Sequence, residues 1–380
     1  MNPRENKIYS EVNPVRVLHV INSVETGGAQ TLLASLAKSF SKSIEAHLLV
    51  LADVDTLSPL FESEFASVAY LGLGKSSFGI FQLLHSAAKH IRRVNPQVVH
   101  SHLLHSDFVN LVLAKFNNWA PITTVHSSGV SQAEPTRSRL LQKIVAHCSW
   151  RFASIIASSS MAKQYALTQG YCPRLITQVN NGVYVAEKHG QDLTKRKNDF
   201  ISLARFHPVK DHGNLFKAVS LVKNGISPLL TCLGEGMLLE NPAVNSLTQK
   251  YGVNKKLELQ GPKLNVLDQL AKHRYLVISS ISESLPMAGL EAISIGVPVI
   301  TTDAGDSKSL TLEDWQCVPV GDPASLASAM EKALRLSDDE YESLSARSIQ
   351  LAQAHFSLLN VARSYEQIYL GVVDEDYLRH

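Results

Sequence analysis

The chain contains 380 residues, of which 45% are hydrophobic and 18% charged. This composition excludes a disordered or collagen-like chain, and the length predicts two domains. The formal net charge is only +2, from 36 basic and 34 acidic side chains, which argues against a dedicated nucleic-acid-binding protein.

The near-neutral total conceals a charge asymmetry between the two halves. Residues 1–186 carry 16 Lys and Arg against 10 Asp and Glu, a net of +6, and residues 187–380 carry 20 against 24, a net of −4. The stretch 65–186 holds 11 basic residues and only two acids, Asp107 and Glu134. A basic half joined to an acidic half suggests that the basic half has a negatively charged partner.

Nothing in the sequence indicates export or a membrane span. The N-terminal segment has no apolar core of a signal peptide, and no run reaches the roughly 18 apolar residues that cross a bilayer. The cysteines are scattered, which favours reduced thiols over a disulfide framework or a zinc site. We therefore expect a cytoplasmic protein. The four cysteines are Cys148, Cys172, Cys232 and Cys317.

The first half alternates short apolar, β-branched runs with longer amphipathic stretches, the pattern of a parallel sheet covered by helices on both faces. The expected strands are 15–23, 46–54, 68–73, 97–104, 121–127 and 154–160. The expected helices are 29–40, 78–94, 108–115 and 136–152.

A polar segment, 187–199, reads as a linker, and the alternation restarts after it. The final segment, 338–378, reads as two helices with Ser357 as N-cap of the second. The expected strands of the second half are 200–205, 229–233, 257–260, 275–280, 298–302 and 317–320, with helices at 289–294 and 324–335. Two α/β units facing one another would bind a ligand in a cleft at the carboxyl ends of their strands.

Gly27 and Gly28 lie between the first expected strand and the first expected helix. Glycine permits close approach to the backbone, and a helix start offers free N–H groups to an anion. The motif is not GxGxxG, so a dinucleotide fold is poorly supported. The alternative interpretation is an ordinary strand-to-helix turn.

Arg205 and Lys210 follow the first strand of the second half. Two cations at a strand's carboxyl end could hold a diphosphate, the guanidinium through paired hydrogen bonds and the ammonium as a point charge. The alternative is two solvated surface cations.

Glu283 precedes a Ser-Leu-Pro turn that should open a helix, and Glu291 would lie about two turns into that helix. Carboxylates facing a cleft can accept hydrogen bonds from vicinal sugar hydroxyls. The alternatives are an exposed acid favoured by the helix dipole for Glu283, and a buried ion pair for Glu291.

Histidines gather at two strand ends, with His100, His102 and His105 at one and His126 at the other. A metal site is conceivable, but neither carboxylate ligands nor groups that would hold the second nitrogen of each ring are evident, so no metal is expected. His126 is the one placed to face the cleft.

In order and spacing, these features resemble the family-4 retaining glycosyltransferases of GT-B fold, which have two Rossmann-like domains and a C-terminal helix that crosses back to the first. The resemblance covers nearly the whole chain. It rests on VVHSHLL, ITTVHSSG, SLARFHPVKDH, LGEG, SESLPMAGLEAISIGVPVITTDAG and VPVGDPASLASAM. The Arg-x4-Lys and Glu-x7-Glu spacings make chance agreement improbable.

The resemblance implies a role for each matching residue. Arg205 and Lys210 would hold the donor diphosphate, Glu283 the donor sugar's hydroxyls and Glu291 the nucleotide ribose, while His126 would lie near the transferred sugar. Other donor contacts would come from Gly27, Gly28, Gly261, Lys263 and the helix start Leu285, Pro286 and Met287.

The resemblance also implies a domain division. Residues 1–186 would bind the acceptor, 187–199 link the domains, 200–362 bind the nucleotide-sugar donor, and 363–380 pack back on the first domain. Neither a metal nor another cofactor is expected, because no DxD element is present and the nucleotide-sugar is a substrate. The expected products are cell-surface polysaccharides such as capsule, lipopolysaccharide or exopolysaccharide, made from a lipid-linked or glycan acceptor.

The chain departs from the family's pattern near the donor. Ser284 and Asp306 replace glycines, and Ser309 replaces a glutamate. These departures leave the nucleotide and sugar open, although a UDP-sugar is expected. A GT-B nucleotide-sugar epimerase and a non-catalytic GT-B partner protein are the alternative functions.

The basic half provides one more expectation. We expect its face to contact the anionic inner leaflet of the membrane, where a lipid-linked acceptor would lie, with solvated helix faces as the alternative. The cations concerned are Lys75, Lys89, Arg92, Arg93, Arg137, Arg139, Lys143 and Arg151.

Overall fold

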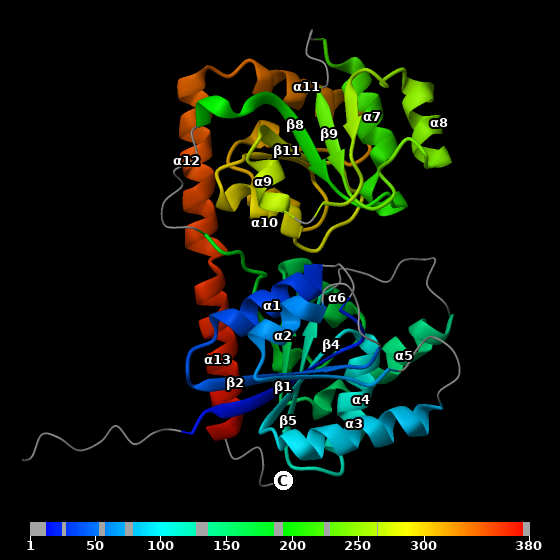
Figure 1. Ribbon diagram of the computed structural model, residues 1–380, viewed down its shortest axis with the longest axis vertical. Coiled ribbons are helices and arrows are strands. Elements are labelled where there is room, and N and C mark those ends of the chain that lie inside the picture. Colours follow the sequence, from blue (N-terminus) through cyan, green and yellow to red (C-terminus); the bar gives the residue numbers. More distant parts are fainter. Residues whose placement is uncertain are drawn as a thin grey trace, which may run out of the picture.

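The structure, a computed structural model, describes residues 13–24, 28–52, 58–72, 79–126, 136–185, 193–223, 229–263 and 265–374. Two domains stand one above the other, each a parallel sheet between layers of helices (Figure 1). The expected α/β architecture of two Rossmann-like domains is confirmed.

The N-terminal domain is built on a seven-stranded sheet of order β3-β2-β1-β4-β5-β6-β7. Six strands were predicted. The seventh, β7, is too short and too exposed for an apolar pattern to reveal it. The strands are β1 (Val15–Ile21), β2 (Ile44–Val50), β3 (Ser67–Tyr70), β4 (Val98–His102), β5 (Ala120–Val125), β6 (Ser154–Ala157) and β7 (Ile176–Gln178). The helices are α1 (Gly28–Ser39), α2 (Ser58–Glu64), α3 (Ile80–Val94), α4 (Leu104–Ala114), α5 (Thr136–His147) and α6 (Ser160–Thr168).

Alternation along the strands places an apolar core on each face of this sheet. Val17 packs with Leu32 and Leu36 of α1, whereas its neighbour Leu18 packs with Ile91 of α3 on the other side. Both faces are therefore buried, which explains why the strands read as continuous apolar runs.

The C-terminal domain repeats the plan with a six-stranded sheet of order β10-β9-β8-β11-β12-β13. The strands are β8 (Lys197–Leu203), β9 (Leu230–Leu233), β10 (Leu257–Leu259), β11 (His273–Ile278), β12 (Val299–Thr302) and β13 (Cys317–Val318). The helices are α7 (His212–Leu221), α8 (Pro242–Tyr251), α9 (Val266–Leu270), α10 (Met287–Ser294), α11 (Pro323–Leu334), α12 (Asp338–His355) and α13 (Leu358–Asp374).

The end of the expected linker 187–199 belongs to the C-terminal domain. β8 begins at Lys197, and both Arg196 and Asp199 are buried. The Arg196 guanidinium donates to the carbonyls of Ile295 and Gly296, each at 2.6 Å. Charged residues can be buried when they are hydrogen-bonded in this way. The polar composition of the segment does not reveal which of its residues are buried.

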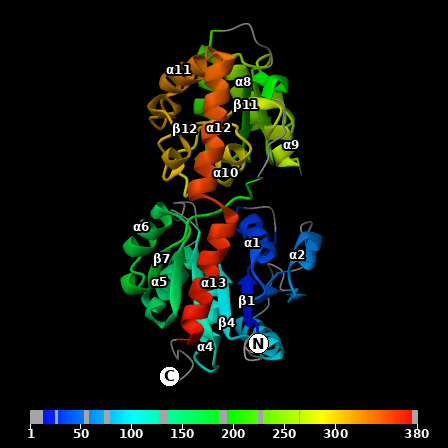
Figure 2. The same ribbon diagram turned by 90° about the vertical axis from the view of Figure 1, so that its left-hand side faces the viewer.

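Two C-terminal helices lie almost in line along one side of the molecule, α12 against the upper domain and α13 against the lower one (Figure 2). The chain crosses between them, because Phe356 packs in the C-terminal core and Leu358 in the N-terminal core. The whole of α13 thus accompanies the N-terminal domain, and its start at Leu358 precedes the expected boundary at 363.

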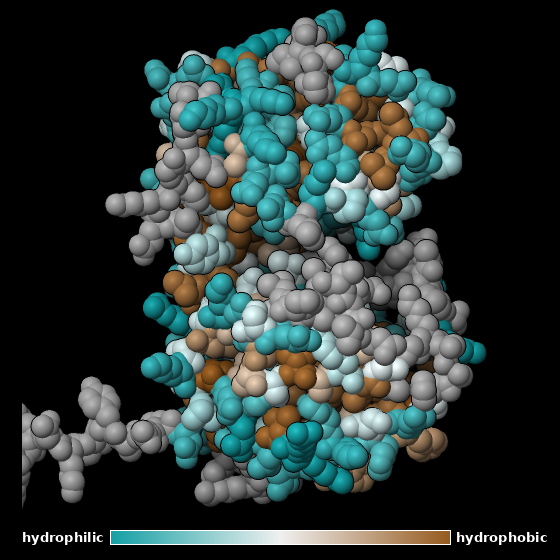
Figure 3. All heavy atoms as spheres, in the orientation of Figure 1, coloured by the Kyte–Doolittle hydropathy of each residue, from teal (hydrophilic) through white to brown (hydrophobic). Residues whose placement is uncertain are grey.

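On the face shown in Figure 3, hydrophilic side chains predominate and apolar ones reach the surface in separate small groups on both domains. Among the described residues, no helix combines the length and apolar character that crossing a bilayer requires.

Candidate active site

The strand ends of the two domains meet where the start of α6 touches the loops that follow β11 and β12. The hydroxyls of Ser159 and Ser284 are 2.7 Å apart. The Asp306 carboxylate accepts hydrogen bonds from the Ser160 hydroxyl and, at 3.2 Å, from the Met161 N–H. A carboxylate is stabilised at a helix N-terminus, so these contacts form a polar bridge between the domains.

Lys210 and Glu283 lie beside this bridge and form an ion pair. The Lys210 Nζ atom is 2.6 Å from Oε1 of Glu283, and the Ser280 hydroxyl donates to the same oxygen at 2.6 Å. The Glu283 side chain is only 11% exposed and precedes α10, so it is not the exposed helix-start acid of the alternative interpretation. Both residues were predicted to hold the donor, and the structure brings them together.

The backbone around this pair is held from two sides. The Ser279 hydroxyl donates to the Lys210 carbonyl at 2.8 Å, and the Ile281 N–H donates to the Val209 carbonyl at 2.8 Å. Gly305 has a φ of +62°, and a Cβ there would lie 1.8 Å from the Glu283 carbonyl oxygen. Only glycine fits this position, because the backbone of the Glu283 loop packs directly against Gly305.

Arg205 lies at the carboxyl end of β8 and is exposed. Among the residues that the structure describes, none forms a hydrogen bond or ion pair with its side chain. Its position depends on Gly234, where a Cβ would lie 2.2 Å from the Ala204 carbonyl oxygen. Arg205 is thus a cation available to an anionic ligand.

The start of α10 is open. Leu285 and Pro286 are buried and anchor the turn, and Met287 is the first helical residue. Pro286 occupies the N-cap position without a side-chain cap, so the first N–H groups of the helix keep their capacity to bind an anion.

Glu291 lies on α10 and is half-buried. Burial raises the pKa of its carboxyl to about 7. The ion pair considered as its alternative interpretation is not found among the described residues. Ligand hydroxyls that donate hydrogen bonds to such a buried carboxylate would stabilise its charged form.

Among the remaining predicted donor residues, none that the structure describes forms a hydrogen bond with Lys210 or Glu283. Gly261 is buried with a φ of +65° and packs on Leu238, while Lys263 is exposed. Gly28 begins α1, and Gly27 lies outside the described residues.

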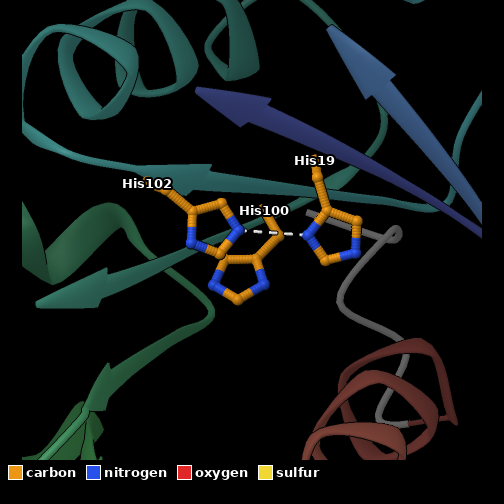
Figure 4. Close-up of side chains that lie close together, drawn as sticks. All are labelled: His19, His100 and His102. Atoms are coloured by element: carbon orange, nitrogen blue, oxygen red, sulfur yellow. Dashed lines mark hydrogen bonds between the residues drawn. The ribbon is translucent and has the colours of Figure 1, made fainter. Parts of the chain in front are cut away.

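The histidines form a connected group beneath the N-terminal strand ends. Nδ1 of His102 is 3.2 Å from Nε2 of His126, and Nε2 of His102 is 3.1 Å from Nδ1 of His19. Figure 4 shows His19, His100 and His102 close together beside the strands. His105 is not part of the group and instead contacts Asn22 at 3.3 Å.

Burial keeps these rings neutral. It lowers the pKa of His19 to about 3 and that of His126 to about 4, and it holds the pKa values of His100 and His102 well below the usual range. His100 bonds to the Tyr369 hydroxyl at 2.7 Å, which ties the group to α13.

Sequence reasoning missed three features of this site. His19 was overlooked although it is a polar residue inside the apolar run of β1, which was the available signal. Ser280, the second partner of Glu283, had no distinguishing pattern. For the bridge at Asp306 the sequence does contain a clue, because Ser284 and Asp306 stand where the family's pattern has glycines. Only the tertiary structure shows which residues they contact.

Curated relatives are glycosyltransferases. The chain is 24% identical over 305 residues to the capsular polysaccharide biosynthesis glycosyltransferase CapH of Staphylococcus aureus, covering 78% of this chain and 83% of CapH. It is 21% identical over 297 residues to the Campylobacter jejuni N-acetylgalactosamine-N,N'-diacetylbacillosaminyl-diphospho-undecaprenol 4-alpha-N-acetylgalactosaminyltransferase, covering 74% and 79%.

Solved structures show the same fold at low identity. Anabaena HepE, in complex with UDP and glucose, matches with a TM-score of 0.80 and 14% identity, covering 94% of this chain and 100% of HepE. S. aureus TarM matches with a TM-score of 0.73 and 9% identity, covering 93% and 99%.

The fold and the family models that match the chain identify a glycosyltransferase of the GT-B class. Two family models match adjoining parts of the chain, "Glycosyltransferase Family 4" over residues 26–187 and "Glycosyl transferases group 1" over residues 186–350. The chain belongs to glycosyltransferase family 4, as the motifs had indicated.

Proposed function

We propose that this protein is a retaining, metal-independent hexosyltransferase that moves a sugar from a UDP-sugar to a lipid-linked or growing glycan acceptor in the synthesis of a cell-surface polysaccharide. The observation that carries the proposal is the Lys210–Glu283 pair, with Arg205 exposed in the same β8–α7 connection as Lys210. A site of this kind offers cations to a diphosphate and a carboxylate to sugar hydroxyls.

Charge stabilisation at the leaving group is the main chemical task. As the sugar–oxygen bond breaks, the diphosphate gains negative charge. In this proposal Arg205, Lys210 and the N–H groups at the start of α10 stabilise that charge. Glu283 would accept hydrogen bonds from the donor sugar, and Glu291 from the ribose. With fixed cations in these roles, the reaction needs no metal, and EDTA should leave the rate unchanged.

The relatives suggest the class of acceptor. The names of two of them, from C. jejuni and Escherichia coli, include undecaprenol-linked diphosphate sugars, and the E. coli name specifies UDP-Gal as its donor. We extend this to a lipid-linked or glycan acceptor for the present protein, bound mainly by the N-terminal domain, where His126 would lie near the transferred sugar.

The decisive experiment combines a panel of nucleotide-sugars with a panel of lipid-linked and soluble glycan acceptors. The proposal expects UDP release that depends on the acceptor, and a product whose anomeric configuration, read by NMR, matches that of the donor. Release without an acceptor, with a new epimer formed, would instead indicate a GT-B epimerase. Binding without turnover of any donor would indicate a non-catalytic partner.

A membrane contact completes the proposal. Helix α5 exposes Leu140 (61%) and Ile144 (44%), and Trp150 just beyond it is 62% exposed. The exposed cations Arg137 and Lys143 lie on the same helix. Apolar side chains among cations are typical of a helix that lies in the interface of an anionic bilayer.

Other cations of the basic face support the same reading. Lys89, Arg92 and Arg93 are exposed on α3, whose first turn exposes Phe81 (84%), whereas Lys75 lies outside the described residues. Co-sedimentation with vesicles should increase with the fraction of anionic lipid and decrease with salt. Leu140→Ser with Ile144→Ser should reduce it, and Leu221→Ser, an exposed leucine on α7, serves as control. Binding that is independent of lipid charge would contradict the contact.

A further inference from the structure

We propose that His102 is a positioning residue for sugar transfer: with His19, it fixes the tautomer of His126 so that the Nδ1–H of His126 is the donor left for the substrate. The inference rests on the proposed function, in which His126 lies near the transferred sugar. The tautomer of His126 can be measured without turnover, so the inference and the proposed function can fail separately.

The three rings form a linear chain across neighbouring strands. His19 lies on β1 and His102 on β4, which pair directly, and His126 follows β5, the next strand in the sheet. The two contacts are 3.1 Å from His19 Nδ1 to His102 Nε2 and 3.2 Å from His102 Nδ1 to His126 Nε2. Both nitrogens of the central ring are therefore engaged.

Neutral rings make the directions of these bonds interdependent. Burial lowers the pKa of all three imidazoles, so each ring carries one N–H and one lone pair. If His19 donates to His102, then His102 must donate to His126, and the proton of His126 must lie on Nδ1. If the first bond runs the other way, every proton moves to the opposite nitrogen.

The buried end of the chain determines the direction. Nε2 of His19 is buried and has no hydrogen-bond partner among the described residues. With the proton on Nε2, the chain would bury an N–H group without an acceptor. A buried lone pair without a donor is tolerated more often than a buried N–H without an acceptor. The proton of His19 is therefore assigned to Nδ1, which donates to His102.

The consequence appears at His126. Its Nε2 accepts from His102, and no described residue bonds to its Nδ1. His126 therefore carries its N–H on Nδ1, and we infer that this N–H, rather than a basic lone pair, is available to the substrate. An N–H can orient a sugar hydroxyl oxygen by donating to it, but it cannot remove a proton from the acceptor.

His100 supports the chain without belonging to it. Its Nδ1 bonds to the Tyr369 hydroxyl and its Nε2 to the Thr124 hydroxyl, each at 2.7 Å. Its ring lies 4.3 Å from that of His102, centroid to centroid.

A metal is the competing use of these rings, because His19, His100 and His102 have nitrogens within 4.8 Å of one another. Figure 4 shows, however, that His19 and His102 direct nitrogens at each other. Both nitrogens of His100 are already bonded as well. The present geometry is that of a hydrogen-bonded chain, and a metal would have to break it.

The first test is a long-range ¹H–¹⁵N correlation spectrum of the full chain labelled in histidine, which reports the tautomer of each ring. His19, His102 and His126 are expected as Nδ1–H tautomers. A His126 signal of the Nε2–H tautomer would overturn the proposal. So would a joint shift of the three buried rings on addition of Zn²⁺, because it would reveal a metal site.

The second test uses variants of the central ring. Asparagine places an N–H near the position of Nδ1, whereas leucine fills similar space without one. His102→Leu should release His126 toward the Nε2–H tautomer that free imidazole prefers, and lower kcat tenfold or more with less than a twofold change in UDP affinity. His102→Asn should restore the Nδ1–H tautomer and most of kcat.

Equal losses in the two variants, with the tautomer of His126 unchanged, would show a merely structural role and overturn the inference. If His102→Leu fails to fold, the wild-type spectrum still decides the tautomer. Full turnover in His126→Ala would instead refute the role of His126 in the proposed function, leaving the tautomer assignment intact.

Discussion

Glu283 directs Oε1 at the Lys210 ammonium, 2.6 Å away, so the C-terminal domain holds a cation and a carboxylate at one point between two loops. Each partner limits the motion of the other. The proposed donor must bind to both residues while they remain paired, or break the ion pair between them. The contributions of Lys210 and Glu283 to donor binding are therefore coupled.

Substitution of either partner should therefore impair transfer strongly. Lys210→Met removes the positive charge that would stabilise the leaving diphosphate. Glu283→Gln weakens the hydrogen bonds that the carboxylate would accept from sugar hydroxyls. Each is expected to lower kcat by about 10²–10³, the usual effect of losing one transition-state contact. The double variant should lose much less than the product of the single losses. Steady-state kinetics test this, with Lys217→Ala, an exposed cation on α7, as control. Unchanged turnover in both single variants would refute the mechanism.

Arg205 should contribute to ligand binding rather than to folding, because its side chain is exposed and unbonded among the described residues. Arg205→Ala is expected to weaken UDP affinity about tenfold, the loss of one charge-assisted contact. The Tm should stay within a degree of wild type, as for Lys217→Ala. Calorimetric titration and thermal unfolding measure the two quantities. A large fall in Tm would show that the guanidinium supports the fold instead.

Glu291 predicts a dependence of stability on pH. Its carboxyl has a pKa of about 7 in the folded chain against about 4.5 when unfolded. Between these values the folded chain holds a proton that the unfolded chain has lost, so stability falls as pH rises through this window. Glu291→Gln stays neutral and should be the more stable protein above pH 7, by at most about 3 kcal/mol. Thermal unfolding at pH 5 and pH 8 tests this.

The same substitution should weaken UDP binding if Glu291 contacts the ribose. Glu291→Gln could raise the stability at pH 8 without lowering the affinity for UDP. This result would confirm the buried carboxyl but contradict its proposed ligand.

The histidine chain predicts the opposite dependence. Burial holds the pKa of His19 near 3, below the value of about 6.5 in the unfolded chain. As pH falls below 6.5 the unfolded chain takes up protons first, so the folded state loses about 1.4 kcal/mol per pH unit for each such histidine. His19→Asn keeps an N–H near Nδ1 but cannot titrate, and should flatten the acid limb of a Tm–pH curve. His85→Asn, on the exposed side of α3, should leave it unchanged.

Asp306 should govern how tightly the domains associate, because its carboxylate is bonded to Ser160 and Met161 across the interface. Asp306→Gly restores the glycine of the family's pattern and removes both bonds. We expect a larger radius of gyration by X-ray scattering and little change in Tm, since neither hydrophobic core is touched. An unchanged scattering curve would show that the Asp306 contacts are dispensable, and that other contacts, such as the one between Ser159 and Ser284, suffice to hold the domains together.

Much of the fold was predictable from local pattern. Strands such as β1 and β4 are buried on both faces and read as apolar runs, and their alternation with amphipathic helices predicts parallel sheets. Errors arose where tertiary contacts override composition. Arg196 looked like linker but is buried, because backbone carbonyls of a distant loop accept its hydrogen bonds.

Sequence by itself determined the family, the two domains and the residue types at the strand ends, because spacing within one loop or helix is a local property. The arrangement of those residues was decided by the tertiary structure. Lys210 meets Glu283, and Ser160 meets Asp306, through contacts between segments far apart in the chain. His19 joins His102 only because β1 and β4 are neighbours in the sheet. No local pattern encodes such pairings, since they depend on how the strands and domains pack.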